Sequence, residues 1–244
     1  FDHTPDAALL KYVSIGTDDR LFAIAELLRR GVDASTICNH TQIDMLFLDC
    51  VKKVVDYERV LAAHPGDRDC LIKAKRIGFA DRYIAKLWNT DEDAVFGLRR
   101  EMKLFPVYKT IDTCAGEFPG YVPYFYSTYE EENESIVEDR RKVIVLGSGP
   151  IRIGQGVEFD YSTVHAIQTI KNAGYEAIII NNNPETVSTD YTTSDKLYFE
   201  PLTVEDVMNV VEQEKPEGVI ASLGGQTAIN LAQPLTDLGV NIIG

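Results

Sequence analysis

The sequence predicts an all-α helical domain, residues 1–140, followed by an α/β domain with an open parallel sheet, residues 141–244. Two observations predict this fold class. In residues 1–107, apolar side chains recur at intervals of three and four, which is the period of an amphipathic helix. From Lys142 onward, short β-branched segments alternate with helical ones, a pattern typical of a parallel sheet covered by helices. A chain of 244 residues is long enough for two such domains.

Six helices are expected before the connector, at about 18–31, 33–41, 42–64, 67–77, 81–88 and 90–102. The longest carries an apolar stripe that predicts one buried face, made of Ile43, Phe47, Cys50, Val51, Val54, Tyr57 and Leu61. The basic cluster Lys73, Lys75 and Arg76 is expected to face solvent. Aspartates at the helix starts are expected to act as caps, so this region predicts packing and assembly rather than catalysis.

Residues 108–141 form a connector in which strand-prone aromatic residues are interrupted by proline and glycine. Two short extended segments are expected here, packed over the helices or over the following domain. The acidic run 130–139 is expected to be a linker, and the domain boundary is placed near Arg140.

The α/β region predicts strands at about 142–146, 175–181, 196–199, 218–222 and 240–243, with helices at about 158–173, 203–213 and 226–238. Ligands of such sheets bind beyond the carboxyl ends of the strands. Three loops leave those ends, at 147–156, 181–190 and 224–227. We therefore expect them to form a single polar, glycine-lined site.

The glycines of these loops allow sharp turns and a close approach to an anionic ligand; they are Gly147, Gly149, Gly154, Gly156, Gly224 and Gly225. A nicotinamide dinucleotide fits the motif poorly, because the third glycine of a GxGxxG pattern falls on Arg152. Asn181 stands where such sites carry an acidic ribose ligand. An independent nucleotide-binding oxidoreductase nevertheless remains an alternative. Glu158 and Glu185 are the two carboxylates of interest beside the loops.

Composition excludes several classes of protein. The net charge of −14 argues against a nucleic-acid-binding surface, and the lack of an apolar run of 18 residues predicts no membrane span. The four cysteines include no CxxC pair and the four histidines have no metal-ligand spacing, so no metal site is expected. Reduced thiols predict a cytoplasmic protein. The chain does not begin with Met, and we expect it to be the middle of a longer protein.

Long motifs then carry a family resemblance. GSGPIRIGQGVEFDY, NNNPETVSTDYTTSDKLYFEPLT and GVIASLGGQTAINLA resemble the large subunit of carbamoyl phosphate synthetases, at the start of its second synthetase half. FAIAELLRRG, TQIDMLFL, AKRIGFAD and IDTCAGEF resemble the oligomerisation domain of that subunit, and PYFYSTYEEENE resembles the joint between the two. The resemblance implies a helical oligomerisation domain followed by a Rossmann-like pre-ATP-grasp domain.

The resemblance also implies a function for the parent protein. The family is an ATP-dependent ligase that makes carbamoyl phosphate from ATP, bicarbonate and ammonia supplied by a glutaminase small subunit. ATP and magnesium would bind the ATP-grasp domain, expected just after Gly244. This chain would then hold no catalytic residue and no tightly bound cofactor, and would be inactive alone.

By motif, Gly156, Glu158 and Glu185 correspond to residues lining the family's tunnel for carbamate. Other large subunits are expected as partners, with self-association through residues 1–107. A purely structural assembly module remains an alternative. Ser148 stands where a glycine is common, and Arg152 would lie near the anion path or at the domain joint. The arginine and pyrimidine pathways are not distinguished.

Overall fold

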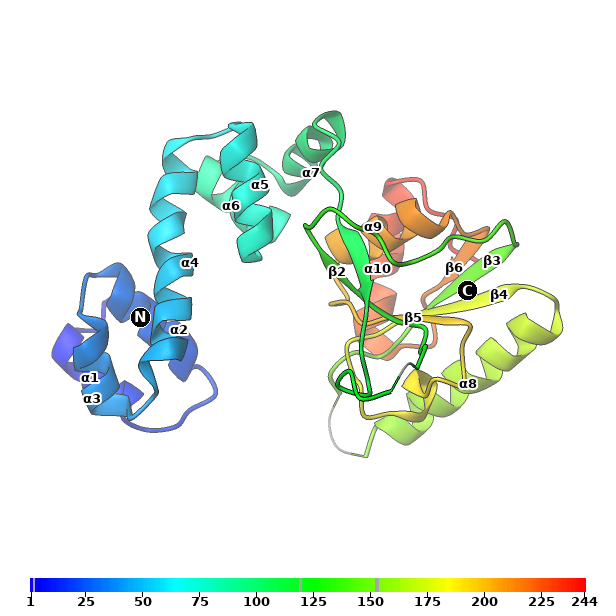
Figure 1. Ribbon diagram of the computed structural model, residues 1–244, viewed down its shortest axis with the longest axis horizontal. Coiled ribbons are helices and arrows are strands. Elements are labelled where there is room, and N and C mark those ends of the chain that lie inside the picture. The colour runs from blue at the N-terminus through cyan, green and yellow to red at the C-terminus, as the bar shows by residue number, and fades with distance from the viewer. Residues whose placement is uncertain (2, 119, 152–153) are drawn as a thin grey trace. The chain divides into compact units, whose positions relative to one another are not determined.

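The chain forms two compact units, Phe1–Met102 and Lys103–Gly244. The computed structural model describes residues 1, 3–118, 120–151 and 154–244 (Figure 1). The first unit is helical and the second is a sheet with helices, which confirms the predicted fold class.

Seven helices build the described part of the first unit: α1 (Asp6–Val13), α2 (Arg20–Arg29), α3 (Ala34–Thr41), α4 (Met45–Ala63), α5 (Arg68–Ile77), α6 (Asp81–Trp88) and α7 (Glu92–Glu101). The six expected helices are all present, whereas α1 was not expected. Aspartates begin many of them: Asp33, Asp44, Asp67 and Asp91 each accept a backbone N–H with the side chain. Gly78 ends α5 in the left-handed conformation that lacks a penalty only for glycine.

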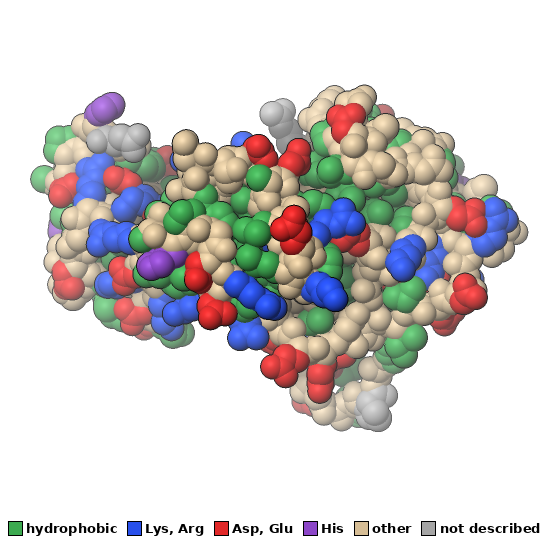
Figure 2. Space-filling model, turned by 90° about the horizontal axis from the view of Figure 1, so that it is seen from above, with side chains coloured by type: hydrophobic (Ala, Val, Ile, Leu, Met, Phe, Trp, Pro, Cys, Tyr) green, Lys and Arg blue, Asp and Glu red, His purple; other side chains and the backbone are tan. Residues whose placement is uncertain are grey.

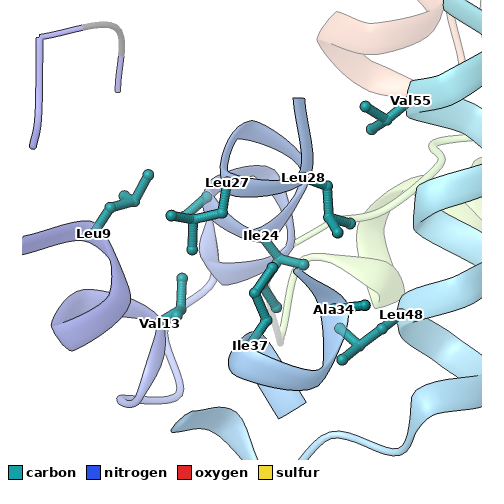
Figure 3. Packing of buried hydrophobic residues seen from close by; sticks show 10 residues of the cluster. Leu9, Val13, Ile24, Leu27, Leu28, Ala34, Ile37, Leu48 and Val55 are labelled. Atoms are coloured by element: carbon teal, nitrogen blue, oxygen red, sulfur yellow. The ribbon is translucent and has the colours of Figure 1, made fainter. Parts of the chain in front are cut away.

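Helix α4 connects two small cores. On one side, α1, α2, α3 and the first half of α4 enclose buried side chains that include Leu9, Val13, Ile24, Leu27, Ile37 and Leu48 (Figure 3). The second half of α4 packs against α5 and α6, where Tyr57 and Leu61 are buried. The stripe predicted to be one buried face is therefore covered only in part, because Phe47 and Val54 are exposed.

A buried ion cluster holds α5, α6 and α7 together. The Asp81 carboxylate is fully buried and accepts hydrogen bonds from Lys75 Nζ at 3.0 Å and from Arg99 Nε at 2.7 and 2.9 Å. Lys75 Nζ also donates to Phe79 O at 2.7 Å. The prediction that Lys75 faces solvent is thus wrong, because a fully buried carboxylate draws its ammonium group inward.

Replacement of Asp81 by Asn should destabilise the first unit by about 3–5 kcal/mol, because the buried carboxylate that Lys75 and Arg99 share loses its charge. The free energy of unfolding from urea denaturation, followed by the fluorescence of Trp88, measures this change. Asp49→Asn, at an exposed position of α4, is the control and should change stability by less than about 0.5 kcal/mol. Equal stabilities of the two variants would contradict the assigned role of the cluster.

The second unit contains a six-stranded sheet in the order β1-β2-β5-β4-β3-β6. Its strands are β1 (Val107–Thr110), β2 (Tyr124–Thr128), β3 (Lys142–Leu146), β4 (Glu176–Ile180), β5 (Lys196–Tyr198) and β6 (Gly218–Ile220). All neighbouring pairs are parallel except β1 and β2. The connector belongs to this sheet, because β2 pairs with β5. The boundary between the compact units therefore lies at Lys103 and not near Arg140.

Helices cover both faces of the sheet (Figure 1). Helix α8 (Gly156–Asn172) packs Ile167 and Ile170 against one face of β3 and β4. The alternate residues Val143 and Val145 of β3 and Ala177 and Ile179 of β4 form this face. Helices α9 (Val204–Glu214) and α10 (Gly225–Asp237) lie across the sheet from α8. The strand expected at 240–243 is present only as an isolated parallel bridge between Ile242 and Val219.

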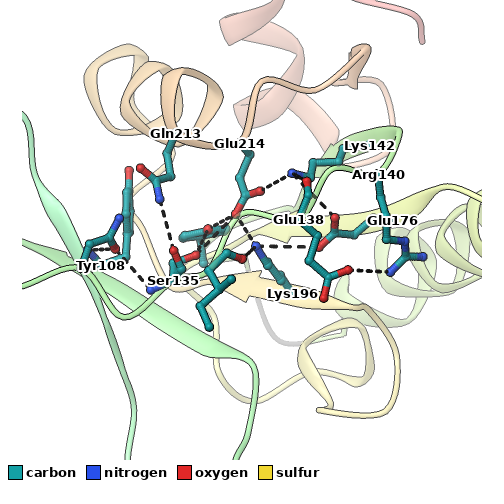
Figure 4. A network of polar contacts seen from close by, with 12 residues as sticks. Tyr108, Ser135, Glu138, Arg140, Lys142, Glu176, Lys196, Gln213 and Glu214 are labelled. Carbon is teal, nitrogen blue, oxygen red and sulfur yellow. Dashed lines mark hydrogen bonds and ion pairs between the residues drawn. The ribbon is translucent and has the colours of Figure 1, made fainter.

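A buried polar cluster ties the amino ends of the central strands to the connector (Figure 4). Lys196 Nζ lies 2.8 Å from Glu214 Oε1 and donates to Ile136 O at 2.6 Å. Lys142 Nζ lies 3.2 Å from Glu214 Oε2 and donates to Glu138 O at 2.7 Å. Burial raises the pKa of Glu176, which lies 3.8 Å from both ammonium groups. The expected acidic linker is thus held to the sheet by two buried lysines.

Glu200 fastens the connector to the sheet at the other end of β5. Its buried carboxylate accepts hydrogen bonds from the backbone N–H of Ser127 and from Ser127 Oγ, the latter at 2.8 Å. Burial raises the pKa of Glu200 to about 7, and the nearby Asp206 charge adds to the effect. Glu200 is therefore protonated more readily in the folded chain than in the unfolded one.

Because this pKa is higher in the folded chain than in the unfolded one, the stabilisation is complete below about pH 4.5 and is lost as the pH rises through 7. Glu200→Gln keeps the group neutral, so the variant should match the wild type at low pH and be more stable above pH 7 by about 3 kcal/mol. Calorimetry from pH 4.5 to 8.5 measures the difference. The variant Glu131→Gln, at an exposed position, should follow the wild-type stability at every pH. A stability difference between Glu200→Gln and the wild type that does not change with pH would contradict the raised pKa of Glu200.

Candidate functional site at the carboxyl ends of the sheet

Three loops meet where neighbouring strands of the sheet end. The first loop follows β3, the second follows β4 and the third follows β6, and these strands lie side by side in the order β4-β3-β6. The expected meeting of the three loops is therefore present in the fold. The first and third loops lead directly into the N-termini of α8 and α10.

Asn181 is the internal support of the first two loops. Its side chain is fully buried, and its Oδ1 atom accepts hydrogen bonds from Gly149 N at 3.0 Å and from Asn183 N at 3.4 Å. A Cβ atom at Gly147 would lie only 2.5 Å from the Asn181 side chain. The asparagine that replaces an acidic ribose ligand thus has a structural role, and glycine at 147 makes room for it.

The third loop touches the first one backbone to backbone. A Cβ atom at Gly224 would lie 2.2 Å from the carbonyl oxygen of Gly147. At Gly225, φ is +66° and a Cβ would lie 3.0 Å from the ring of Phe159 on α8. Only glycine fits this approach, because any side chain would push the two loops apart.

Gly224→Ala should therefore lower the stability of the second unit by about 1–3 kcal/mol or more, since neither the Gly147 carbonyl nor the Ala228 methyl can move aside cheaply. Differential scanning calorimetry measures the loss. Gly156→Ala is the matched control in the same unit, because its Cβ would make an ordinary 3.6 Å contact with Ile151. A melting temperature for Gly224→Ala equal to that of the control would rule out the close contact.

The helix N-termini at the site differ from that of α9. The Thr203 side chain caps α9 by accepting from Asp206 N at 3.2 Å. In contrast, α8 and α10 have no capping side-chain hydrogen bond. Their first N–H groups therefore have no side-chain acceptor, although Glu158 N of α8 donates to Gln155 O at 3.3 Å, and the helix dipoles favour negative charge at these ends.

One open hollow of about 470 Å³ lies between α8 and the second loop. Gly154, Gly156 and Glu185 line it together, so the structure gathers three of the residues predicted for the site. Its other walls are mainly apolar or aromatic and are formed by Val157, Tyr161, Val164, His165, Thr186 and Val187, with the acidic Asp160 as a further lining residue. The Tyr161 and His165 rings contact each other, with centroids 4.3 Å apart.

Two residues that were not predicted hold the second loop over α8. The buried Asp160 carboxylate accepts from Ser188 N at 2.9 and 3.1 Å. Tyr124 of β2 donates its hydroxyl hydrogen to Thr189 O at 2.5 Å. The only sequence signal for Asp160 is its place one helical turn after Gly156, which puts both on one face of α8. Nothing in the sequence links Tyr124 to residues 65 positions further on.

The two predicted carboxylates occupy different places. Glu185 is exposed at the rim of the hollow, and its backbone N–H donates to Asn183 Oδ1 at 3.0 Å. Glu158 is exposed in the first turn of α8 and lies outside the described lining of the hollow. It stands about 110° around the helix from the middle of the lining face. Arg152 lies outside the described residues.

The described residues do not fit a resident metal ion, since they contain no cluster of three or more Asp, Glu, His or Cys side chains. None of the described helices is long and apolar enough to cross a membrane. On the face seen in Figure 2, Lys and Arg side chains are interspersed with Asp and Glu. That distribution differs from the contiguous basic surface typical of nucleic-acid binding.

The fold and the site together define a two-unit chain in which a helical unit precedes a glycine-lined α/β unit, without a metal-binding cluster among the described residues. Residues 139–244 match the family model described as the carbamoyl phosphate synthase preATP-grasp domain. Residues 2–103 match the model described as the carbamoyl-phosphate synthetase large chain, oligomerisation domain. The chain belongs to the carbamoyl phosphate synthetase large-chain family.

Proposed function

We propose that this chain is the central segment of the large subunit of a carbamoyl phosphate synthetase, and that its second unit forms the floor and tunnel wall of the half that phosphorylates carbamate. The observation that carries the proposal is the hollow at the carboxyl edge of the sheet, where Gly154, Gly156 and Glu185 lie together. The order of the two matched domains supports it, because the oligomerisation domain directly precedes the preATP-grasp domain.

The character of this wall suits the passage of a labile anion. Carbamate is small and negatively charged, and the Glu185 carboxylate at the rim repels an anion that lingers beside it. The valine side chains of the hollow offer no hydrogen bonds, whereas the N-terminus of α8 attracts negative charge. Attraction at the helix end and repulsion at the rim together guide an anion without holding it tightly.

In this proposal, chemistry is supplied by the ATP-grasp domain expected after Gly244. ATP and magnesium act there, and the described residues of this chain offer no magnesium cluster of their own. The chain alone is inactive, because phosphoryl transfer requires a clamp on the nucleotide. Its residues shape and position the path of the intermediate between the two ATP-dependent steps.

The first unit assembles the enzyme through contacts with other large subunits, as the description of its matched family model suggests. The glutaminase small subunit is the remaining partner and supplies ammonia. An independent nicotinamide-dependent oxidoreductase is disfavoured, because the residue after β4 is the fully buried Asn181, which supports the first loop. A side chain so placed cannot take an exposed ribose hydroxyl.

Glu185→Ala in the full-length synthetase should lower the carbamoyl phosphate formed per ATP consumed severalfold, while bicarbonate-dependent ATP hydrolysis continues. The reason is that carbamate, once Glu185 no longer repels it, lingers at the rim and is lost before it reaches the second ATP-dependent step. The measurement is the ratio of product to ADP with ammonia as the nitrogen source. Glu131→Ala, at an exposed connector position, is the control, and Glu158→Ala should have a smaller effect than Glu185→Ala. Unchanged coupling in Glu185→Ala would refute the tunnel role.

A further inference from the structure

The apolar stripe along α4 is only half covered. Phe47, Cys50, Val51 and Val54 follow the spacing i, i+3, i+4 and i+7, which places them on one face of the helix. Tyr57 and Leu61 continue the same face and are buried beside α5 and α6. In the first half of the stripe, Phe47 is 63% exposed, Val54 is 37% exposed and Cys50 is exposed.

The neighbouring core does not account for these side chains. Leu48 and Val55 point into the core formed with α1, α2 and α3, as Figure 3 shows, and the half-buried Val51 packs against that core from the side of the stripe. Phe47 and Val54 lie about 100° around the helix from Leu48 and Val55. Leu46, 66% exposed, extends the same surface toward the start of α4. An uncharged helical stripe of this kind in a soluble unit marks an interaction surface.

We propose that this stripe, Phe47–Val54 of α4, pairs with the same stripe of a second copy of the chain, with the two α4 helices antiparallel across a two-fold axis. The inference rests on the proposed assembly role of the first unit and specifies the surface that performs it. A two-fold interface requires a surface that complements itself, because each copy presents the same residues.

The side-chain sizes along the stripe meet that requirement. With the axis between Cys50 and Val51, Phe47 of one copy lies opposite Val54 of the other, and Cys50 lies opposite Val51. Large and small side chains then alternate across the contact and can interdigitate. A parallel pair would instead place Phe47 against Phe47. The stripe positions carry no charge, so an acidic or basic partner has nothing to recognise there, whereas a second copy does.

Val60 provides a matched control on the same helix. It is 42% exposed, close to the 37% of Val54, but lies six residues further along and therefore about 120° around the helix from it. Both Val54→Asp and Val60→Asp add one charge at an exposed valine of α4. Only Val54→Asp places that charge in the proposed contact, and the symmetry places it there twice.

Sedimentation velocity of the whole chain over a concentration series tests the proposal. The wild type and Val60→Asp should associate alike, whereas Val54→Asp should raise the dissociation constant at least about tenfold. Circular dichroism must show the same helix content in all three proteins. If the wild type associates and both variants associate as it does, the surface is wrong and the assembly role stands. A monomeric wild type at every concentration overturns the assembly role, and this inference with it.

Cross-linking gives an independent readout. Cys50 lies next to the proposed axis, so a short bis-maleimide should link two copies of the wild type and of Val60→Asp, but not of Cys50→Ser or Val54→Asp. The other three cysteines are half-buried and remain in Cys50→Ser, so a dimer band in that variant would place the contact elsewhere and overturn the proposal.

Discussion

The second unit depends on one contact, the backbone approach of Gly224 to the carbonyl of Gly147. Because no side chain fits between them, the loops after β3 and β6 lie in close backbone contact. The buried Asn181 side chain also holds the first loop, because its Oδ1 atom accepts a hydrogen bond from the Gly149 N–H. The two loops in contact lead into the N-termini of α8 and α10, neither of which has a side-chain cap. The contacts between the loops at the carboxyl ends of the strands thus involve mainly backbone groups.

At the amino ends of the strands, the main contacts are between buried charged side chains. Lys142 and Lys196, at the amino ends of their strands, share the buried carboxylate of Glu214. Burial of such groups stabilises little in net terms, but each lysine also binds a carbonyl oxygen of the connector and so fixes where that segment runs. The connector in turn places β2, whose Tyr124 supports the second loop from 65 residues away. The polar cluster thus holds one part of the connector, and Tyr124 in another part of it contacts the second loop.

The sequence was sufficient for the features that depend on local patterns. Strand–helix alternation predicted the sheet after Lys142, and the order of its elements predicted that three loops meet at the carboxyl ends of the strands. Features that depend on long-range contacts were either not predicted or predicted wrongly. The connector joined the sheet because Phe125 and Tyr108 pack on Tyr198, which no local pattern shows. Lys75 was drawn inward by Asp81, and the α4 stripe looked buried because periodicity reports an apolar face but not what covers it.

The separation of Glu158 from Glu185 sharpens the role of the site. Motif similarity assigned both carboxylates to one path, yet only Glu185 lines the described hollow, while Glu158 lies around α8 from it. One helix separates them, so a path that touches both must pass around the N-terminus of α8 and not along a single wall. That end of the helix lies immediately after the glycine loop, where Gly154 and Gly156 leave the backbone bare. In the proposed tunnel, a small anion that turns this corner would meet the positive end of the helix dipole between two carboxylates, an order of attraction and repulsion that would keep it moving.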